Sequence, residues 1–464
     1  MGVYGEYALI FAVAAVATYL LAFPVRRVAI RFGAIARPDD LHLHTAPVPT
    51  IGGVAMFGGF VVALVLASQL GALGPVFRGS SEPIGVALAA LVICLVGFVD
   101  DIREISPPAK VAGQVLAAMI LLFLGVTMYY FKIPFVSTIF VLSPSILPLV
   151  TAIWVVGMAN AVNLIDGLDG LAAGIIAIAA GTLCVYGLRL EVLGNLSADN
   201  LGPVIAAITC GVCVGFLPHN FHPARVFMGD GGALFLGLLM AAATMVIGGR
   251  TTANGAAATD VTGLTFFRFA PLFIPIFILG VPLLDTTFAI VRRTVRGTSF
   301  AERDLGHLHH RLVRLGHGHR RAVLILWAWT AVLSIFVLLP TFSLRFNAFV
   351  PFVAVLSVAM LYTVFLPGAR PRVPLPAIAG HESATGVGAP DGEPEAAPIS
   401  VVMSAAAGVA VAGEPDLASP KSRRRRRLVR RARHRRTTEK ASRDDPATGA
   451  PSARIAGPGD DMGG

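Results

Sequence analysis

The sequence has little charge and few cysteines. Charged residues make up 14% of its 464 residues, well below the roughly 25% of soluble globular chains. The four cysteines lie inside apolar stretches and lack the His or Cys neighbours of a zinc site, so they resemble small buried apolar residues. The low charge argues against a soluble protein, and therefore against a nucleic acid as the partner of the net charge of +10.

Apolar residues are abundant, at 55% of the chain. They gather in runs long enough to cross about 30 Å of hydrocarbon. We predict an all-α polytopic membrane protein with about 11 transmembrane helices. The runs lie near Tyr7–Phe23, Ile51–Gly71, Ile84–Val99, Val111–Met128, Ile146–Ala159, Leu171–Leu188, Leu201–Leu217, Ala233–Ile247, Phe269–Val291, Ala322–Pro340 and Phe349–Leu366.

Charges beside the first run predict the orientation. Glu6 precedes its core, whereas Arg26, Arg27 and Arg31 follow it. We therefore expect no cleaved signal peptide, an N-terminus outside and a C-terminus in the cytoplasm. From there, successive loops alternate between the two sides of the membrane. This alternation places most loop Lys and Arg residues on the cytoplasmic side, as the positive-inside rule requires.

The alternation also brings six aspartates to the cytoplasmic face, at or near the ends of apolar runs. They are Asp100, Asp101, Asp166, Asp169, Asp230 and Asp285. A carboxylate at a membrane boundary is costly unless it is paired, metal-bound or in contact with water. This convergence predicts a functional site on that face.

The composition changes after about Pro367 to Ala, Gly, Pro and Ser, with basic blocks at Arg423–Arg427 and Arg430–Arg436. Such a segment is typical of disorder. We therefore predict a transmembrane domain at residues 1–366 and a disordered cytoplasmic tail at residues 367–464.

Asp100 and Asp101 stand together at the end of the third run, followed by Lys110. Adjacent carboxylates repel, and a divalent cation or a transferable proton would relieve that repulsion. An ordinary acidic helix end is the alternative, because a carboxylate that reaches interfacial water costs little.

Two Asp-Gly pairs follow the fifth run, with Asn160 and Asn163 ahead of them. Asp166 and Asp169 would share one face if the segment were helical, and the glycines would let a phosphate or sugar approach the backbone. Asp-Gly pairs also form turns, which is the structural alternative.

Asp230 lies in the run Gly229-Asp230-Gly231-Gly232 at the start of a span. It is a plausible Mg²⁺ ligand, because Mg²⁺ is usually held by one or two carboxylates together with substrate phosphates and water. A glycine-rich turn with Asp230 as a helix cap is the alternative, and both can hold at once.

Histidines gather at His307, His309 and His310, in a loop rich in arginine. No familiar zinc spacing accompanies them, and basic side chains near a phosphate site are the better interpretation. A cluster attracted to anionic lipid is the alternative, favoured for His317–Arg321. In the first loop His44 could contact a phosphate, although taken alone Pro38–Gly53 favours a plain connecting loop.

The order of these motifs resembles the polyprenyl-phosphate N-acetylhexosamine-1-phosphate transferases, integral membrane enzymes that start the lipid-linked assembly of cell-wall glycans. Asp100-Asp101 is similar to the family's aspartate pair, and Asn163–Gly170 to its N-x-x-D-G-x-D-G pattern. Gly229–Gly232 is similar to its G-D-x-G element. The H-x-H-H form at His307–His310 resembles the WecA-like branch, which uses UDP-N-acetylglucosamine, and the surrounding sequence resembles its actinobacterial members.

The resemblance implies transfer of N-acetylglucosamine-1-phosphate from UDP-N-acetylglucosamine to a polyprenyl phosphate at the cytoplasmic face of the plasma membrane. It implies Mg²⁺, with Mn²⁺ as the alternative, on Asp230, and it leaves a homodimer open. The catalytic aspartates would be Asp100, Asp101, Asp166 and Asp169. The substrate-binding residues would be Lys110, Asn163, His44, His307, His309 and His310.

Two other functions remain open at this point. The sibling branch of the family transfers phospho-N-acetylmuramoyl-pentapeptide, and typically has three consecutive histidines where this chain has His307–His310. A cation-coupled secondary transporter would instead place ionisable residues near the bilayer midplane, on discontinuous helices.

Overall fold

The computed structural model describes residues 2–36, 48–132, 139–248 and 318–342. All of them belong to the first of the two units into which the chain divides, Met1–Pro376. The predicted spans near Phe269–Val291 and Phe349–Leu366 lie outside the described residues, and so does the predicted tail.

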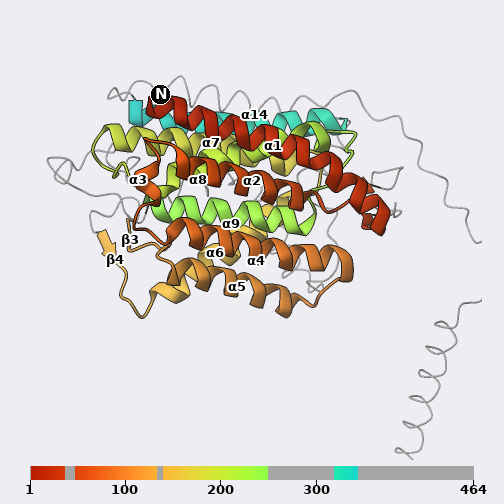
Figure 1. Cartoon of the computed structure of the whole chain (residues 1–464), viewed down its shortest axis with the longest axis horizontal. Coiled ribbons are helices and arrows are strands. Elements are labelled where there is room, and N and C mark those ends of the chain that lie inside the picture. The colour runs from red at the N-terminus through yellow and green to blue at the C-terminus, as the bar shows by residue number, and fades with distance from the viewer. Residues whose placement is uncertain (1, 37–47, 133–138, 249–317, 343–464) are drawn as a thin grey trace, which may run out of the picture. The chain divides into compact units, whose positions relative to one another are not determined.

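Long helices make up most of the described chain (Figure 1). They are α1 (Val3–Phe32), α2 (Gly52–Gln69), α4 (Glu82–Arg103), α5 (Pro107–Phe123), α6 (Leu147–Ile165), α7 (Leu171–Val192), α8 (Leu201–Asn220), α9 (Gly229–Gly248) and α14 (His319–Phe342). Seven of these, all except α5 and α14, are long and apolar enough to cross a membrane. The predicted class, a helical polytopic membrane protein, agrees with this architecture.

Some helices extend beyond the apolar runs that predicted them, among them α1 and α6. α1 continues past Phe23 to Phe32 and ends at Gly33, whose left-handed conformation (φ 71°) closes the last turn. The shortest predicted run, Ile146–Ala159, corresponds to α6, which has 19 residues and ends at Ile165. The helix therefore continues past the apolar run, and polar residues such as Asn163 lie in its last turns.

Short elements in the connections were not predicted. The antiparallel strands β1 (Ile35–Ala36) and β2 (Val48–Pro49) pair Ile35 with Pro49. The strands β3 (Tyr130–Lys132) and β4 (Ile139–Val141) pair Tyr130 with Val141. α3 (Gly74–Phe77) is a single turn, and the buried Glu6 holds the two residues before it by accepting hydrogen bonds from the N–H groups of Ala72 and Leu73.

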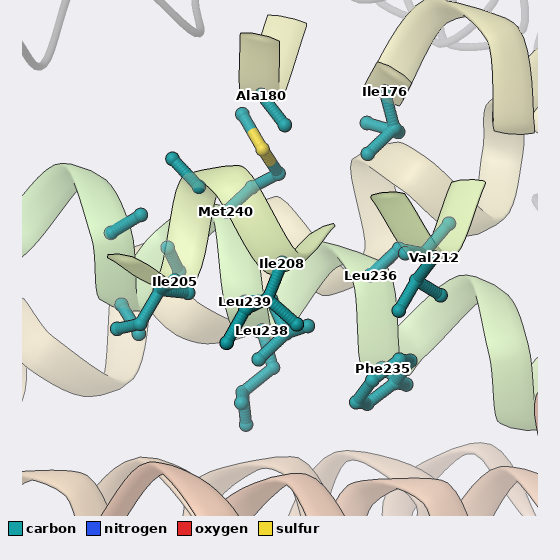
Figure 2. Packing of buried hydrophobic residues seen from close by; sticks show 14 of the residues in the cluster. Ile176, Ala180, Ile205, Ile208, Val212, Phe235, Leu236, Leu238, Leu239 and Met240 are labelled. Atoms are coloured by element: carbon teal, nitrogen blue, oxygen red, sulfur yellow. The ribbon is translucent and has the colours of Figure 1, made fainter. Parts of the chain in front are cut away.

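α9 is the central helix. Every residue from Gly231 to Gly248 is buried, and α9 contacts α2, α4, α6, α7 and α8. Figure 2 shows Phe235, Leu236 and Met240 of α9 among side chains of α7 and α8, including Ile176 and Ile208. A helix that is apolar on all sides is expected to lie in the interior. Its position lets neighbouring helices reach its first turn together.

Glycines bring three backbones into contact at the start of α9. A Cβ atom added to Gly97 of α4 would lie 2.4 Å from the Cα atom of Gly231. One added to Gly53 of α2 would lie 2.7 Å from the Cα atom of Gly232. Small residues permit this close approach of membrane helices. α2 and α4 therefore fix the place of the first turn of α9.

We expect the substitution Gly97→Ala to destabilise the protein, because its methyl group would meet backbone that has no room to give. Overpacking of this kind typically costs about 1–3 kcal/mol. The measurement is the midpoint of thermal unfolding of the detergent-solubilised protein. Gly157→Ala on α6 is the matched control, since its Cβ atom would have no neighbour within 4 Å. Equal midpoints for the two variants would contradict the close approach.

Candidate active site

One end of the helix bundle gathers the polar motifs. Side-chain contacts there join the C-terminal ends of α4, α6 and α8 to the N-terminal ends of α5, α7, α9 and α14. Since consecutive helices run in opposite directions, residues far apart in the sequence meet at this end. The predicted convergence of Asp100, Asp101, Asp166, Asp169 and Asp230 is therefore found in the described residues.

The centre of the site is a cluster around Asp230. Lys110 Nζ lies 2.9 Å from Oδ2 of Asp100 and also binds Oδ2 of Asp230. Asn163 Nδ2 donates to Oδ1 of Asp230 at 2.7 Å. Asp100 is held further by the N–H group of Ile105, which donates to its Oδ1 atom at 2.8 Å. We call Asp100, Lys110, Asn163 and Asp230 the lysine cluster.

Asp101 faces a different partner from its neighbour Asp100. Its two carboxylate oxygens accept hydrogen bonds from the N–H groups of Asp230 (2.8 Å) and Gly231 (3.2 Å). The first N–H groups of a helix have no partner within the helix, and they carry partial positive charge. Asp101 of α4 therefore caps α9 across the helix interface. It orients Asp230 through the backbone.

Gly229 allows this cap to form. It has a left-handed backbone (φ 67°), and a Cβ atom there would lie 2.4 Å from Oδ2 of Asp101. A larger residue would therefore push the carboxylate off the helix terminus. The predicted helix cap lies at this place, but the capping side chain is Asp101, while Asp230 is in the first turn of α9.

Asp166 and Asp169 lie in a turn, so the helical alternative for this segment was wrong. α6 ends at Ile165 and α7 begins at Leu171. The glycines favour this outcome, and Gly170 adopts φ 77° while its N–H group donates to Oδ1 of the buried Asn220 at 3.0 Å. The two aspartates consequently have different surroundings.

Asp166 lies beside the lysine cluster. Burial raises the pKa of Asp166 to about 7, and the nearby carboxylates of Asp230, Asp101 and Asp169 raise it further. Three carboxylates therefore act on Asp166 in addition to its burial. The carboxylate of Asp166 is thus in a position to gain from an added cation.

Asp169 faces the segment that follows α8. Its Oδ2 atom lies 2.7 Å from Nδ1 of His222 and accepts a hydrogen bond from the N–H group of Ala224 at 3.1 Å. The ring of His222 stacks on that of His319, with centroids 4.5 Å apart. Arg320 Nε donates to the carbonyl oxygen of His222 at 3.0 Å.

No role was predicted for His222, and His319 was predicted to belong to the lipid-attracted cluster His317–Arg321. The structure places both side chains beside Asp169. His222 stands in the polar stretch Pro218–Pro223 between two apolar runs. That position, close to the end of a span, was the available signal. His44, His307, His309 and His310 lie outside the described residues, so their predicted roles remain predictions.

The donor set of the site fits a divalent cation of the magnesium class. Asp100, Asp166 and Asp230 offer carboxylate oxygens, which are the protein ligands that Mg²⁺ prefers. Burial, and then the neighbouring carboxylates, raise the pKa of Asp166, and a bound cation would lower it. Asp101 differs from these three in that both of its oxygens accept hydrogen bonds from the backbone of α9.

We expect Asp101→Asn to lower the thermal stability. An amide offers one acceptor oxygen to two backbone N–H donors, and its own NH₂ group would face the second donor. Loss of a charged hydrogen bond of this kind typically costs about 1–3 kcal/mol. Thermal unfolding in detergent measures it. Asp199→Asn, the same change at an exposed aspartate between α7 and α8, is the control. A variant as stable as that control would contradict the capping role.

Comparisons with known proteins identify the family of the chain. Residues 83–248, which span α4 to α9, match glycosyl transferase family 4. The chain is 41% identical over 334 residues to the decaprenyl-phosphate N-acetylglucosaminephosphotransferase of Mycobacterium tuberculosis, covering 71% of this chain and 81% of that protein.

Two further relatives span the breadth of the family. A Bacillus subtilis protein named "Probable undecaprenyl-phosphate N-acetylglucosaminyl 1-phosphate transferase" is 35% identical over 352 residues, covering 75% of this chain and 89% of that one. A phospho-N-acetylmuramoyl-pentapeptide-transferase of Desulforudis audaxviator is 33% identical over 336 residues, covering 66% and 89%. The resemblance of the motifs is thus confirmed, and the chain belongs to glycosyl transferase family 4, among the polyprenyl-phosphate N-acetylhexosamine-1-phosphate transferases.

Proposed function

We propose that the chain transfers N-acetylglucosamine-1-phosphate from UDP-N-acetylglucosamine to a membrane polyprenyl phosphate, decaprenyl or undecaprenyl. The products are UMP and polyprenyl-pyrophosphate-N-acetylglucosamine, the first lipid-linked intermediate of a cell-wall glycan. The observation that carries the proposal is the lysine cluster at one end of a bundle of apolar helices. The names of the relatives that are at least 35% identical support the same donor sugar and acceptor class.

In the reaction, an oxygen of the lipid phosphate attacks the β-phosphorus of the nucleotide sugar and UMP leaves. Catalysis of phosphoryl transfer depends mainly on holding the partners in line and neutralising their charge. Lys110 is the described cation best placed to bind phosphate oxygens, since it lies between Asp100 and Asp230. Asp230, with Asp100 and Asp166 beside it, would hold Mg²⁺, or Mn²⁺ in its place, which supplies the remaining positive charge.

The two adjacent aspartates receive different roles. Asp100 contacts the Lys110 ammonium and is suited to position the lipid phosphate. A phosphate monoester is already largely dianionic near neutral pH, its second pKa being about 6, so it needs little help from a general base. Asp101 is a positioning residue, because its carboxylate holds the start of α9 and acts on the substrates only through Asp230.

The proposal places the site on the cytoplasmic face of the plasma membrane, with the N-terminus outside. Three arginines, Arg26, Arg27 and Arg31, support this orientation. They lie in the C-terminal part of α1, and positively charged residues beside a span are expected to remain on the cytoplasmic side. UDP-N-acetylglucosamine then arrives from the cytosol and the polyprenyl chain from the bilayer. About 11 spans, a cytoplasmic C-terminus and a homodimer remain predictions.

The alternatives carry less support. The pentapeptide transferase of Desulforudis audaxviator is less similar than the relatives named for N-acetylglucosamine, and the H-x-H-H form at His307–His310 favours the latter branch. A transporter would need ionisable groups near the middle of its spans. In the described residues the lysine cluster lies at helix ends.

We expect membranes enriched in this protein to transfer label from radiolabelled UDP-N-acetylglucosamine into an organic-extractable lipid when polyprenyl phosphate and Mg²⁺ are present. Asp230→Asn should lower this rate at least 100-fold, because charge neutralisation at the pyrophosphate dominates the barrier. Excess UMP should chase the label back to the nucleotide sugar.

The matched control is Asp199→Asn, which should keep the wild-type rate at equal membrane level. Label that is independent of both Mg²⁺ and Asp230 would refute the assigned metal residue. Labelling only from UDP-N-acetylmuramoyl-pentapeptide would move the chain to the sibling branch, and silence with both donors would refute the proposed reaction.

We propose that residues 1–366 carry catalysis without the basic tail. A chain truncated after Pro367 should retain its specific activity, because the motifs that form the site all precede that residue. The tail's arginines would instead attract anionic lipid, at roughly 1 kcal/mol per residue near the surface. The label-transfer assay at matched membrane levels measures this, and a loss of specific activity would count against the domain assignment.

A further inference from the structure

Three potential metal ligands meet beside the lysine cluster. Asp169, His222 and His319 each offer a carboxylate oxygen or an imidazole nitrogen, and the three atoms lie within 4.8 Å of one another. Asp169 belongs to the turn before α7, His222 to the segment after α8, and His319 is the first residue of α14. We call these three residues the histidine cluster.

We infer that the histidine cluster is a second metal site, for a borderline divalent ion of the zinc class, distinct from the carboxylate site that would hold Mg²⁺. The inference does not depend on the transfer reaction. It depends on the types and positions of three side chains, of which only Asp169 belongs to the predicted catalytic set.

The chemistry of the donors favours this ion. Two imidazoles and one carboxylate are a ligand set that suits zinc, which binds nitrogen at about 2.0–2.1 Å, usually with a tetrahedral arrangement. Mg²⁺ prefers oxygen ligands and retains its water. Three protein ligands leave a fourth position for water or a phosphate oxygen. Asp100, Asp166 and Asp230 provide the contrasting set, made of oxygen alone.

The two rings lie against each other beside Asp169. The planes of His222 and His319 are 18° from parallel, with centroids 4.5 Å apart. One ion could therefore meet a nitrogen of each ring. The side chain of Asp169 has a relative exposure of 1%, so a charged carboxylate is kept away from water next to both rings. A buried charge of this kind requires a close positive partner.

The surrounding backbone holds the ligands before any ion binds. The side chain of Asn220 accepts from the N–H group of Gly170 and donates to the carbonyl of Val226, so it fixes both segments that carry Asp169 and His222. Arg320 Nε joins α14 to the carbonyl oxygen of His222. Binding of the ion would therefore cross-link the start of α14 to the segments that carry Asp169 and His222, and would draw the three ligand atoms closer together.

The test uses the full chain, purified in detergent without an oligohistidine tag and stripped with a chelator. Titration with Co²⁺ should produce the intense visible absorption of a tetrahedral site, with one equivalent bound per chain, and excess Mg²⁺ should not remove it. Zn²⁺ should displace the Co²⁺ and raise the midpoint of thermal unfolding. His222→Gln and His319→Gln should each weaken Co²⁺ binding at least tenfold and abolish the zinc-dependent shift.

Two control proteins separate this site from others in the chain. The triple variant His307→Gln, His309→Gln, His310→Gln should keep the Co²⁺ spectrum, and so should Asp230→Asn, even though Asp230 is assigned to Mg²⁺. Loss of the spectrum in the triple variant, or its persistence in both His222→Gln and His319→Gln, would overturn the inference. A wild-type chain with neither the spectrum nor the zinc shift would do so as well, whatever the result of the transfer assay.

Discussion

The first turn of α9 is the constraint on which the site depends. Its N–H groups begin in the interior of an apolar bundle, where an unpaired donor is expensive. Asp101 satisfies two of them from α4, and Gly97 lets α4 approach closely enough to do so. That contact holds the backbone of Asp230 in place. Lys110 and Asn163 then lie where they meet its two oxygens.

The charge balance follows from this arrangement. Asp100, Asp101, Asp166 and Asp230 stand close together, with Lys110 as their described ammonium partner. The excess of negative charge would repel the pyrophosphate of a nucleotide sugar unless a cation came with it. A site with this balance therefore binds its cation and its anionic substrate interdependently. Membrane burial strengthens the effect, because low dielectric amplifies each pairwise interaction.

The sequence predicted the membrane helices and the aspartates that converge, because both depend on local hydrophobicity and on simple alternation. It could not predict which way each aspartate faces. Asp100 and Asp101 are about 100° apart around one helix axis, so the rotation of α4 against α9 decides which one meets Lys110. Asp169 and His222 are 53 positions apart, and no periodicity indicates such a pair. The helical alternative for Asp166 and Asp169 failed because turn-forming glycines outweighed the i, i+3 spacing.

The turn between α6 and α7 also places its two aspartates beside metal-ligand atoms of different chemical types. Asp166 lies beside oxygen ligands, whereas Asp169, three residues later, lies beside imidazoles. Zinc-class ions bind most donor sets more tightly than Mg²⁺ does, so an all-carboxylate site cannot exclude them by affinity alone. A neighbouring imidazole set with higher affinity would capture such ions first. The carboxylates would then remain available to Mg²⁺. A single Asp-Gly-Leu-Asp turn would separate the two metal sites.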